Sequence, residues 1–163
     1  MKTTVIAAFP GTGKSWAHLH CEALTLDSDS SAFSWESTGV RHSEWPTNYM
    51  THIAKNCGMV EYIFVSSHSE VRAAMGAAGI PYVLVLPRRE DKALYLARYE
   101  KRGSPQAFID LLSKHWDTWL DGCAADAGAD RIVVIDGHLA SYLPELRNEE
   151  ADRTAATRKD VDK

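Results

Sequence analysis

Residues able to bind phosphate stand together near the N-terminus. They run in the order Ala8-Phe9-Pro10-Gly11-Thr12-Gly13-Lys14-Ser15. Glycine permits backbone conformations in which successive amides face one side, and such amides at the start of a helix cradle an anion. The lysine adds a positive charge that can reach the β- and γ-phosphates, and a serine hydroxyl can ligate Mg²⁺. The segment therefore predicts a site for a polyphosphate with its magnesium ion.

The elements predicted on either side support this interpretation. The apolar run from Val5 to Phe9 is typical of a buried strand, and the run from Ser15 to Ala23 is compatible with a helix. Strand, loop and helix in this order match the Walker A context, with Ala8 where glycine is commonest. A glycine-rich turn with an accidental lysine is the disfavoured alternative. We predict ATP and Mg²⁺ as cofactors, with contacts from Pro10, Gly11, Thr12, Gly13, Lys14, Ser15 and Trp16.

Two carboxylates follow the second predicted strand, which spans residues 24–26. Asp27 and Asp29 stand directly after it, and ligands of open parallel sheets bind at the carboxyl ends of the strands. One carboxylate there can orient or deprotonate an acceptor hydroxyl while the other holds Mg²⁺ through water. The alternative is that both residues only form a turn or a helix cap.

Strands and helices alternate along the rest of the chain. Further strands are predicted at 60–65, 82–86 and 131–135, and helices at 46–57, 89–101 and 106–125. Another helix is predicted to begin at residue 67 or 69 and to end at residue 76 or 79. This alternation predicts one α/β domain over residues 1–148, in which helices cover both faces of a parallel sheet. Residues 32–46 are expected to be irregular, and residues 149–163 to form a polar, flexible tail.

The spacing of the two motifs resembles that of a known enzyme group. Ala8 to Ser15 followed by Leu26-Asp27-Ser28-Asp29 is similar to the Walker A and D-x-D arrangement of shikimate and gluconate kinases, in the nucleoside monophosphate kinase-like group of P-loop kinases. The resemblance implies a three-layer P-loop NTPase fold with five parallel strands in the order 2-3-1-4-5. It also implies an acceptor role for Asp29 and a magnesium-side role for Asp27, next to Ser15. Small kinases of this kind are typical of bacteriophages.

A basic stretch resembles the small lid of nucleotide kinases, at about residues 88–105. It begins Arg88-Arg89-Glu90-Asp91 and continues to Arg98 and Arg102, which share one helical face. Arginines in a lid neutralise charge on the transferring phosphoryl group. The alternative is a solvated helix with acidic partners. The predicted catalytic residues are Lys14, Asp29, Arg89 and Arg98.

The insert at about residues 32–48 stands where this superfamily has a substrate-binding element. Its aromatic residues and Arg41 suit a nucleobase and its phosphate, although the tryptophans can equally pack a small subdomain. The predicted substrate-binding residues are Asp27, Asp29, Arg41 and Arg102. A nucleoside or deoxynucleoside monophosphate is the first acceptor expected. The alternatives are a small hydroxyl substrate, a polynucleotide hydroxyl, or a regulatory NTP-binding module or ATPase.

Composition limits the partners. The chain has 163 residues and a formal net charge of -4, which disfavours a partner such as long nucleic acid that is held by bulk positive charge. No apolar run approaches the roughly 20 residues of a membrane span. We expect a cytoplasmic monomer or homodimer that acts on a small molecule or nucleotide, in the host cytoplasm if the chain is phage-encoded.

Overall fold

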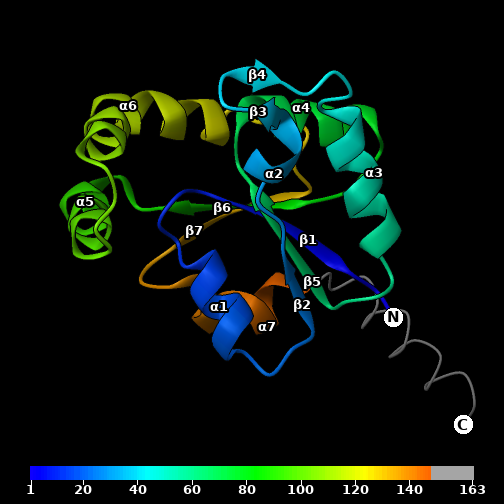
Figure 1. The fold of residues 1–163 in the computed structure, drawn as a ribbon. Coiled ribbons are helices and arrows are strands. Elements are labelled where there is room, and N and C mark those ends of the chain that lie inside the picture. The colour runs from blue at the N-terminus through cyan, green and yellow to red at the C-terminus, as the bar shows by residue number, and fades with distance from the viewer. Residues whose placement is uncertain (148–163) are drawn as a thin grey trace, which may run out of the picture.

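The computed structural model describes residues 1–147. Within them, five strands form one parallel sheet in the order β2-β5-β1-β6-β7 (Figure 1). Their bounds are β1 Thr4–Ala8, β2 Thr25–Asp27, β5 Tyr62–Ser66, β6 Val83–Pro87 and β7 Arg131–Ile135. Strands β3 (Trp35–Ser37) and β4 (Val40–Arg41) pair with each other in a separate antiparallel hairpin. When only the strands of the main sheet are numbered, their order is therefore 2-3-1-4-5.

Helices cover both faces of the sheet. Figure 1 places α3, α4 and α6 above it and α1 and α7 below it, with α5 beside α6 at one end. The helix bounds are α1 Lys14–His20, α2 Ser31–Ser34, α3 Thr47–Asn56, α4 Ser69–Ala77, α5 Lys92–Lys101, α6 Gln106–Ala124 and α7 Leu143–Leu146, with 3-10 turns η1 Arg89–Asp91 and η2 Leu139–Tyr142. The fold is therefore a three-layer α/β arrangement.

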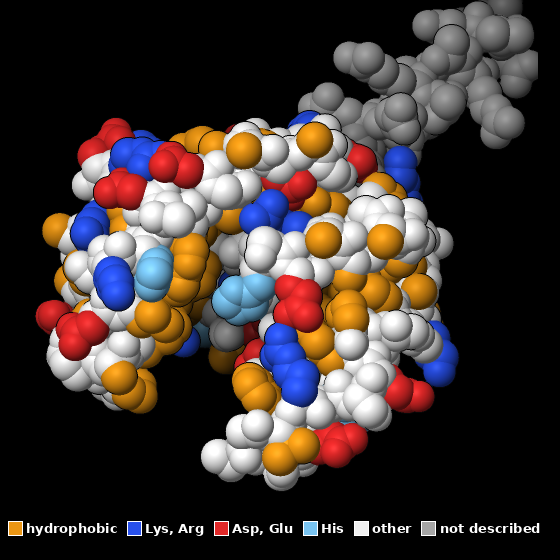
Figure 2. All heavy atoms as spheres, turned by 90° about the horizontal axis from the view of Figure 1, so that it is seen from above, with side chains coloured by type: hydrophobic (Ala, Val, Ile, Leu, Met, Phe, Trp, Pro, Cys, Tyr) orange, Lys and Arg blue, Asp and Glu red, His pale blue; other side chains and the backbone are white. Residues whose placement is uncertain are grey.

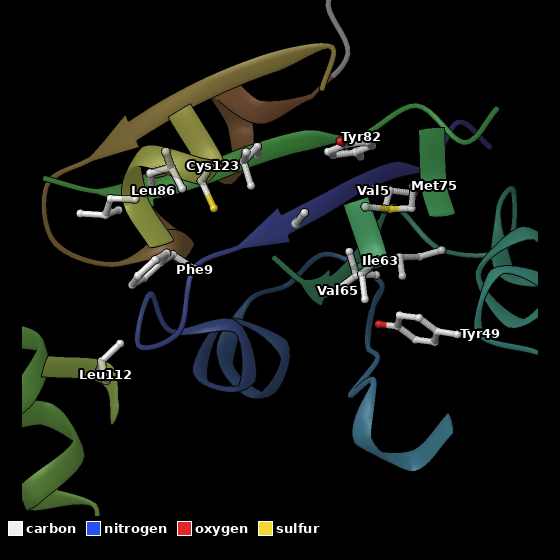
Figure 3. Packing of buried hydrophobic residues seen from close by; sticks show 14 of the residues in the cluster. Val5, Phe9, Tyr49, Ile63, Val65, Met75, Tyr82, Leu86, Leu112 and Cys123 are labelled. Atoms are coloured by element: carbon white, nitrogen blue, oxygen red, sulfur yellow. The ribbon is translucent and has the colours of Figure 1, made fainter. Parts of the chain in front are cut away.

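The burial of the central strand β1 shows why helices cover both faces of the sheet. All its residues are buried, and successive side chains of a strand point to opposite faces. Val5 and Ala7 accordingly join the core under α3, α4 and α6, while Ile6 and Ala8 join the core over α1 and α7. Figure 3 shows the first of these two cores. A strand whose residues are all buried requires that both faces of its sheet are covered.

The end of β1 is fixed against the long helix α6. Phe9 follows the strand, and its ring meets the Trp116 ring edge to face, with the centroids 5.3 Å apart. The Trp116 indole N–H donates to the backbone oxygen of Arg89 at 3.0 Å. The loop after β1 is thereby held in a defined place relative to α6 and η1.

Some expected elements differ from the structure. Residues 32–46 are not uniformly irregular. They include most of α2, which ends at Ser34, and the β3–β4 hairpin that follows it. The expected lid region contains η1 and α5, and α5 packs beside α6. The tail expected at 149–163 lies outside the described residues.

Candidate active site

A cleft of about 1030 Å³ opens beside the carboxyl ends of β1, β2 and β5. Figure 2 shows the surface hollowed next to the α5–α6 end of the molecule. The walls come from the β1–α1 loop, the residues after β2 and β5, the helices α1 and α5, the start of α6 and the loop after β7. Among the lining residues are Pro10, Gly11, Gly13, Lys14, Ser15, Trp16, Asp27, Asp29, Arg98, Arg102 and His138. The structure thus brings most of the predicted site residues to one cleft.

The β1–α1 loop needs glycine at two positions. Gly11 and Gly13 have φ angles of 84° and 98°, a region that residues with a side chain rarely adopt. A Cβ on Gly11 would lie 2.8 Å from the Tyr95 ring, so α5 packs directly on the loop. Thr12 is buried, and its hydroxyl donates to the Phe9 oxygen at 2.8 Å. Thr12 therefore supports the loop from inside, and its side chain does not line the cleft.

Lys14 begins α1 with its side chain folded back toward the sheet. Its Nζ donates to the backbone oxygen of Ala8 at 2.9 Å. Burial lowers the pKa of Lys14 to about 8, against the opposing attraction of Asp27 and Asp29. The group is still protonated at neutral pH, so it offers a poorly hydrated positive charge to an anion in the cleft.

Ser15 and Asp27 lie in contact. The Ser15 hydroxyl donates to Oδ2 of Asp27 at 2.7 Å. In the part of the chain that the structure describes, no three His, Cys, Asp or Glu side chains gather closely enough to hold a metal by themselves. Mg²⁺ usually takes only one or two carboxylates and completes its shell with substrate phosphates and water. One hydroxyl and one carboxylate beside the β1–α1 loop fit that donor set.

Asp29 lies two residues further on and is exposed. Its Oδ1 accepts a hydrogen bond of 2.9 Å from the backbone N–H of Ser31, at the start of α2. This bond fixes the carboxylate but leaves acceptor capacity, because an ionised carboxylate has about four lone-pair sites.

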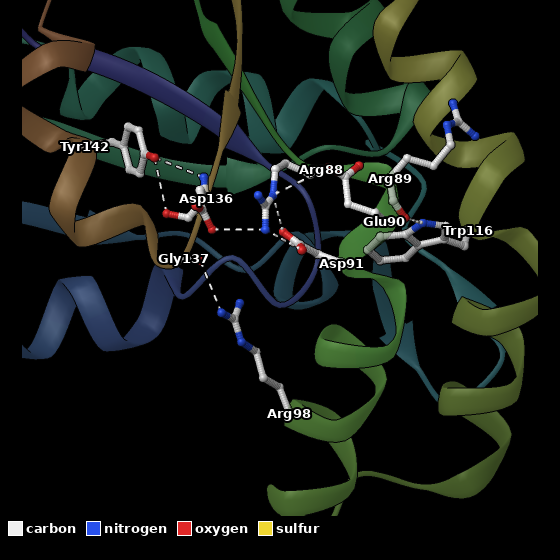
Figure 4. Close-up of polar contacts among 9 residues, drawn as sticks. All are labelled: Arg88, Arg89, Glu90, Asp91, Arg98, Trp116, Asp136, Gly137 and Tyr142. Carbon is white, nitrogen blue, oxygen red and sulfur yellow. Dashed lines mark hydrogen bonds and ion pairs between the residues drawn. The ribbon is translucent and has the colours of Figure 1, made fainter.

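Arg98 on α5 joins two loops of the site (Figure 4). Its guanidinium donates to the Gly11 oxygen at 2.9 Å and to the Gly137 oxygen at 3.2 Å, and lies 4.5 Å from the Tyr95 ring centroid. Arg102 lies one turn later, 5.2 Å from the Tyr99 ring centroid, and also lines the cleft. Within residues 1–147, Arg102 has no carboxylate partner. It is the freer of the two cations.

Arg89, predicted to be catalytic, is not brought to the cleft. Its guanidinium donates to Asp117 and Asp121 of α6 at 2.7 and 2.5 Å, and Figure 4 shows it pointing away from Arg98. Arg88 is engaged too, with Asp91 at 2.8 Å and with Asp136 at 3.3 Å. These two arginines tie η1 to α6 and to the end of β7.

A second cavity of about 630 Å³ adjoins the cleft. It lies among the β3–β4 hairpin, α4 and α6. Five residues line both spaces: Pro10, Asp29, Ser30, Ser67 and His68. The two cavities therefore meet at Asp29, beside the loop that carries Lys14.

Arg41 lines this second cavity and not the cleft. Its guanidinium lies 5.0 Å from the Trp35 ring centroid and 5.3 Å from that of Trp45. It also donates to Oε2 of Glu70 at 2.6 Å. Arg41 does lie among aromatic residues. Its own guanidinium, however, covers the two indole rings on this side of the cavity.

His68 also lies where the two cavities meet, although little in the sequence pointed to it. It precedes α4 and lines both cavities. Burial lowers its pKa, and the positive charges of Lys14 and Arg41 lower it further while Glu70 and Asp29 oppose them. The imidazole is neutral at pH 7 and can accept a proton. The sequence feature that could have pointed to His68 is its position after a predicted parallel strand, where ligands of such sheets bind.

Comparisons with known proteins do not name a family. No protein-family model matches the chain, and no curated protein matches it. An uncharacterised protein from Eubacterium ventriosum, known from a crystal structure, aligns with 13% identity and a TM-score of 0.47 over 89% of this chain and 96% of that chain. A likeness at this level carries no argument about function. No helix within residues 1–147 is long and apolar enough to cross a membrane.

Proposed function

We propose that this chain is a P-loop kinase that transfers the γ-phosphoryl group of ATP to a nucleoside or deoxynucleoside monophosphate. The observation that carries the proposal is the junction of the two cavities at Asp29, next to Lys14 and the Ser15–Asp27 pair. One cavity is suited to the donor and the other to the acceptor, and the transferring group would lie between them.

The donor side uses the β1–α1 loop. The first amides of a helix lack intrahelical acceptors, and α1 has no side-chain cap at its start. These amides and Lys14 would hold the phosphates, while Ser15 and Asp27 would hold Mg²⁺. The bound ion neutralises charge on the β- and γ-phosphates.

The transfer step needs little covalent chemistry from the protein. A bond forms between an acceptor oxygen and the γ-phosphorus as the bond to the β–γ bridging oxygen breaks, and ADP leaves. Lys14 and Arg102 neutralise charge on the transferring group, and Arg98 holds the loop in place. Positioning and charge neutralisation of this kind account for most catalysis of phosphoryl transfer.

A second candidate is transfer to a hydroxyl group, on a small molecule or a polynucleotide. The exposed Asp29 carboxylate and the neutral His68 at the junction favour it, because a hydroxyl must lose a proton and a phosphate dianion need not. An assay that offers acceptors of both kinds separates the two candidate functions.

The test is ADP formation from Mg-ATP across deoxynucleoside monophosphates, sugars, polyols and 5′-hydroxyl oligonucleotides. We expect stimulation by at least one monophosphate, loss of turnover in Lys14→Ala, and wild-type turnover in Lys114→Ala, since Lys114 is exposed on α6 and lines neither cavity. Stimulation only by a hydroxyl acceptor would favour the second candidate. ATP binding without stimulation by any acceptor would contradict a kinase and favour a regulatory NTP-binding module. Retained turnover in Lys14→Ala would remove the phosphate-loop assignment.

A further inference from the structure

Helix α6 leaves an open space in the wall of the second cavity at Gly122. This residue lines the cavity, and a Cβ added to it would meet nothing within 4 Å. Glycine inside a helix costs about 1 kcal/mol relative to alanine. Neither a positive φ nor a close backbone contact requires glycine here. What the glycine contributes is free volume beside the helix.

The wall next to Gly122 carries an aromatic ring. Trp119 lies three residues earlier, on the same side of α6, and also lines the cavity. Its indole stacks on His115, with 5.4 Å between the centroids and 15° between the planes, which holds the ring in place. An open space beside a fixed aromatic ring suits a flat ligand.

The side of the cavity formed by the hairpin has a different character. Arg41 lies over the rings of Trp35 and Trp45 and pairs with Glu70. The hairpin side therefore presents the Arg41–Glu70 ion pair to the cavity in place of two bare indole rings. Because both side chains of this pair are about half exposed, the pair contributes little stability, and a phosphate can compete with Glu70 for Arg41. A flat apolar ring fits the α6 wall better. The volume of about 630 Å³ lies in the range of roughly 300 to 1,000 Å³ that is typical of small-molecule sites.

We infer that the planar base of a nucleoside monophosphate lies against α6, in the space left by Gly122 and beside Trp119, with its phosphate between Arg41 and the junction at Asp29. Gly122 is then the residue that sets the size of base accepted. The inference rests on the proposed function only in treating this ligand as the phosphoryl acceptor, because the base site itself is argued from the cavity.

Two substitutions fill the space to different extents. Gly122→Ala adds one methyl group and Gly122→Leu a larger side chain, at an exposed position on the cavity wall. Both residues are better helix formers than glycine, so we expect neither to lower the melting temperature. Gly76→Leu is the matched control, because Gly76 is also helical, exposed and open at Cβ but lines neither cavity.

Calorimetric binding of the four deoxynucleoside 5′-monophosphates, with a non-hydrolysable ATP analogue present, tests the base site. We expect at least one to bind the wild type and Gly76→Leu equally, and Gly122→Leu to bind it at least tenfold more weakly with unchanged affinity for the ATP analogue. Gly122→Ala should weaken purine binding more than pyrimidine binding, and this graded effect carries the test if Gly122→Leu does not fold. Equal binding by wild type and the Gly122 variants, or no binding to the wild type, would overturn the inference.

Measurements of turnover distinguish a failure of the base site from a failure of the proposed kinase function. A wild type that binds a monophosphate in a Gly122-dependent manner but forms no ADP would support the base site and contradict the kinase. Monophosphate-dependent turnover that is the same in Gly122→Leu would support the kinase and overturn the base site.

Discussion

The Ser15 hydroxyl donates a hydrogen bond of 2.7 Å to Oδ2 of Asp27, which joins the start of α1 to the end of β2. The two residues predicted to serve Mg²⁺ come from different elements, and the order of the sheet brings them together. β2 pairs with β5, β5 pairs with β1, and α1 follows β1. The fold therefore brings together the two residues that we propose to hold Mg²⁺.

The Ser15–Asp27 pair predicts a specific magnesium defect. Asp27→Asn keeps the size of the side chain but removes its negative charge, so we expect the Mg²⁺ concentration for half-maximal ADP formation to rise about tenfold or more. A magnesium titration at saturating ATP measures this. Asp130→Asn is the control, because Asp130 is exposed and lines neither cavity. The same magnesium dependence in both variants would contradict the metal role.

Lys14 predicts an effect of pH on stability. Burial lowers the pKa of the folded-state amine from 10.5 to about 8. Below pH 8 the folded protein carries the full cost of a buried charge. Between pH 8 and 10.5 the folded state has released the proton while the unfolded state keeps it, so the folded protein gains stability as pH rises. Lys14→Met lacks this titration.

The measurement is urea unfolding of wild type and Lys14→Met at pH 7 and pH 10. We expect the wild type to gain stability relative to the variant between these values, since other titrating groups are common to both proteins. Phosphotransfer should be lost in the variant at both values. A stability difference that stays constant with pH would show that the surroundings of Lys14, which is partly buried, do not lower its pKa.

The residues proposed for the donor side were chosen from local sequence patterns. The strand and helix on either side of residues 8–15 are continuous local signals. Asp27 is the last residue of β2, and Asp29 stands two residues beyond it. No local pattern could predict that Arg89 turns away from the cleft, because its partners Asp117 and Asp121 lie on α6, far along the chain. The hairpin could not be predicted either, because its strands have only three and two residues and show no useful period. The second cavity joins segments near residues 30, 41, 70 and 120, so only the tertiary fold defines it.

The different surroundings of Arg102 and Arg89 predict different kinetic effects. Arg102 lines the cleft without a carboxylate partner in the described part of the chain, whereas Arg89 is held by two carboxylates on α6. If Arg102 stabilises the transition state, Arg102→Ala should lower kcat about 10- to 1,000-fold and change ATP affinity little. Arg89→Ala should leave kcat near the wild-type value. The comparison is steady-state kinetics together with ATP binding, and equal losses in both variants would contradict the assignment.

Arg98 predicts a combined loss of stability and rate. Its guanidinium bonds the Gly11 and Gly137 oxygens, so removing it leaves two carbonyls without their charged donor. Hydrogen bonds to charged groups contribute roughly 1.5–3 kcal/mol each, and because Arg98 is only half-buried we expect Arg98→Ala to destabilise the fold by about 1–3 kcal/mol in total. Turnover should also fall, because Gly11 belongs to the β1–α1 loop that we propose to hold the phosphates. Arg102→Ala is the matched control, since it removes an arginine on the same helical face whose side chain donates no hydrogen bond to a described residue. We therefore expect thermal unfolding to separate the variants, with a lower melting temperature only for Arg98→Ala. A melting temperature equal to that of the wild type would mean that Arg98 does not support the loop, and a reduced rate alone would then assign it to the reacting phosphates.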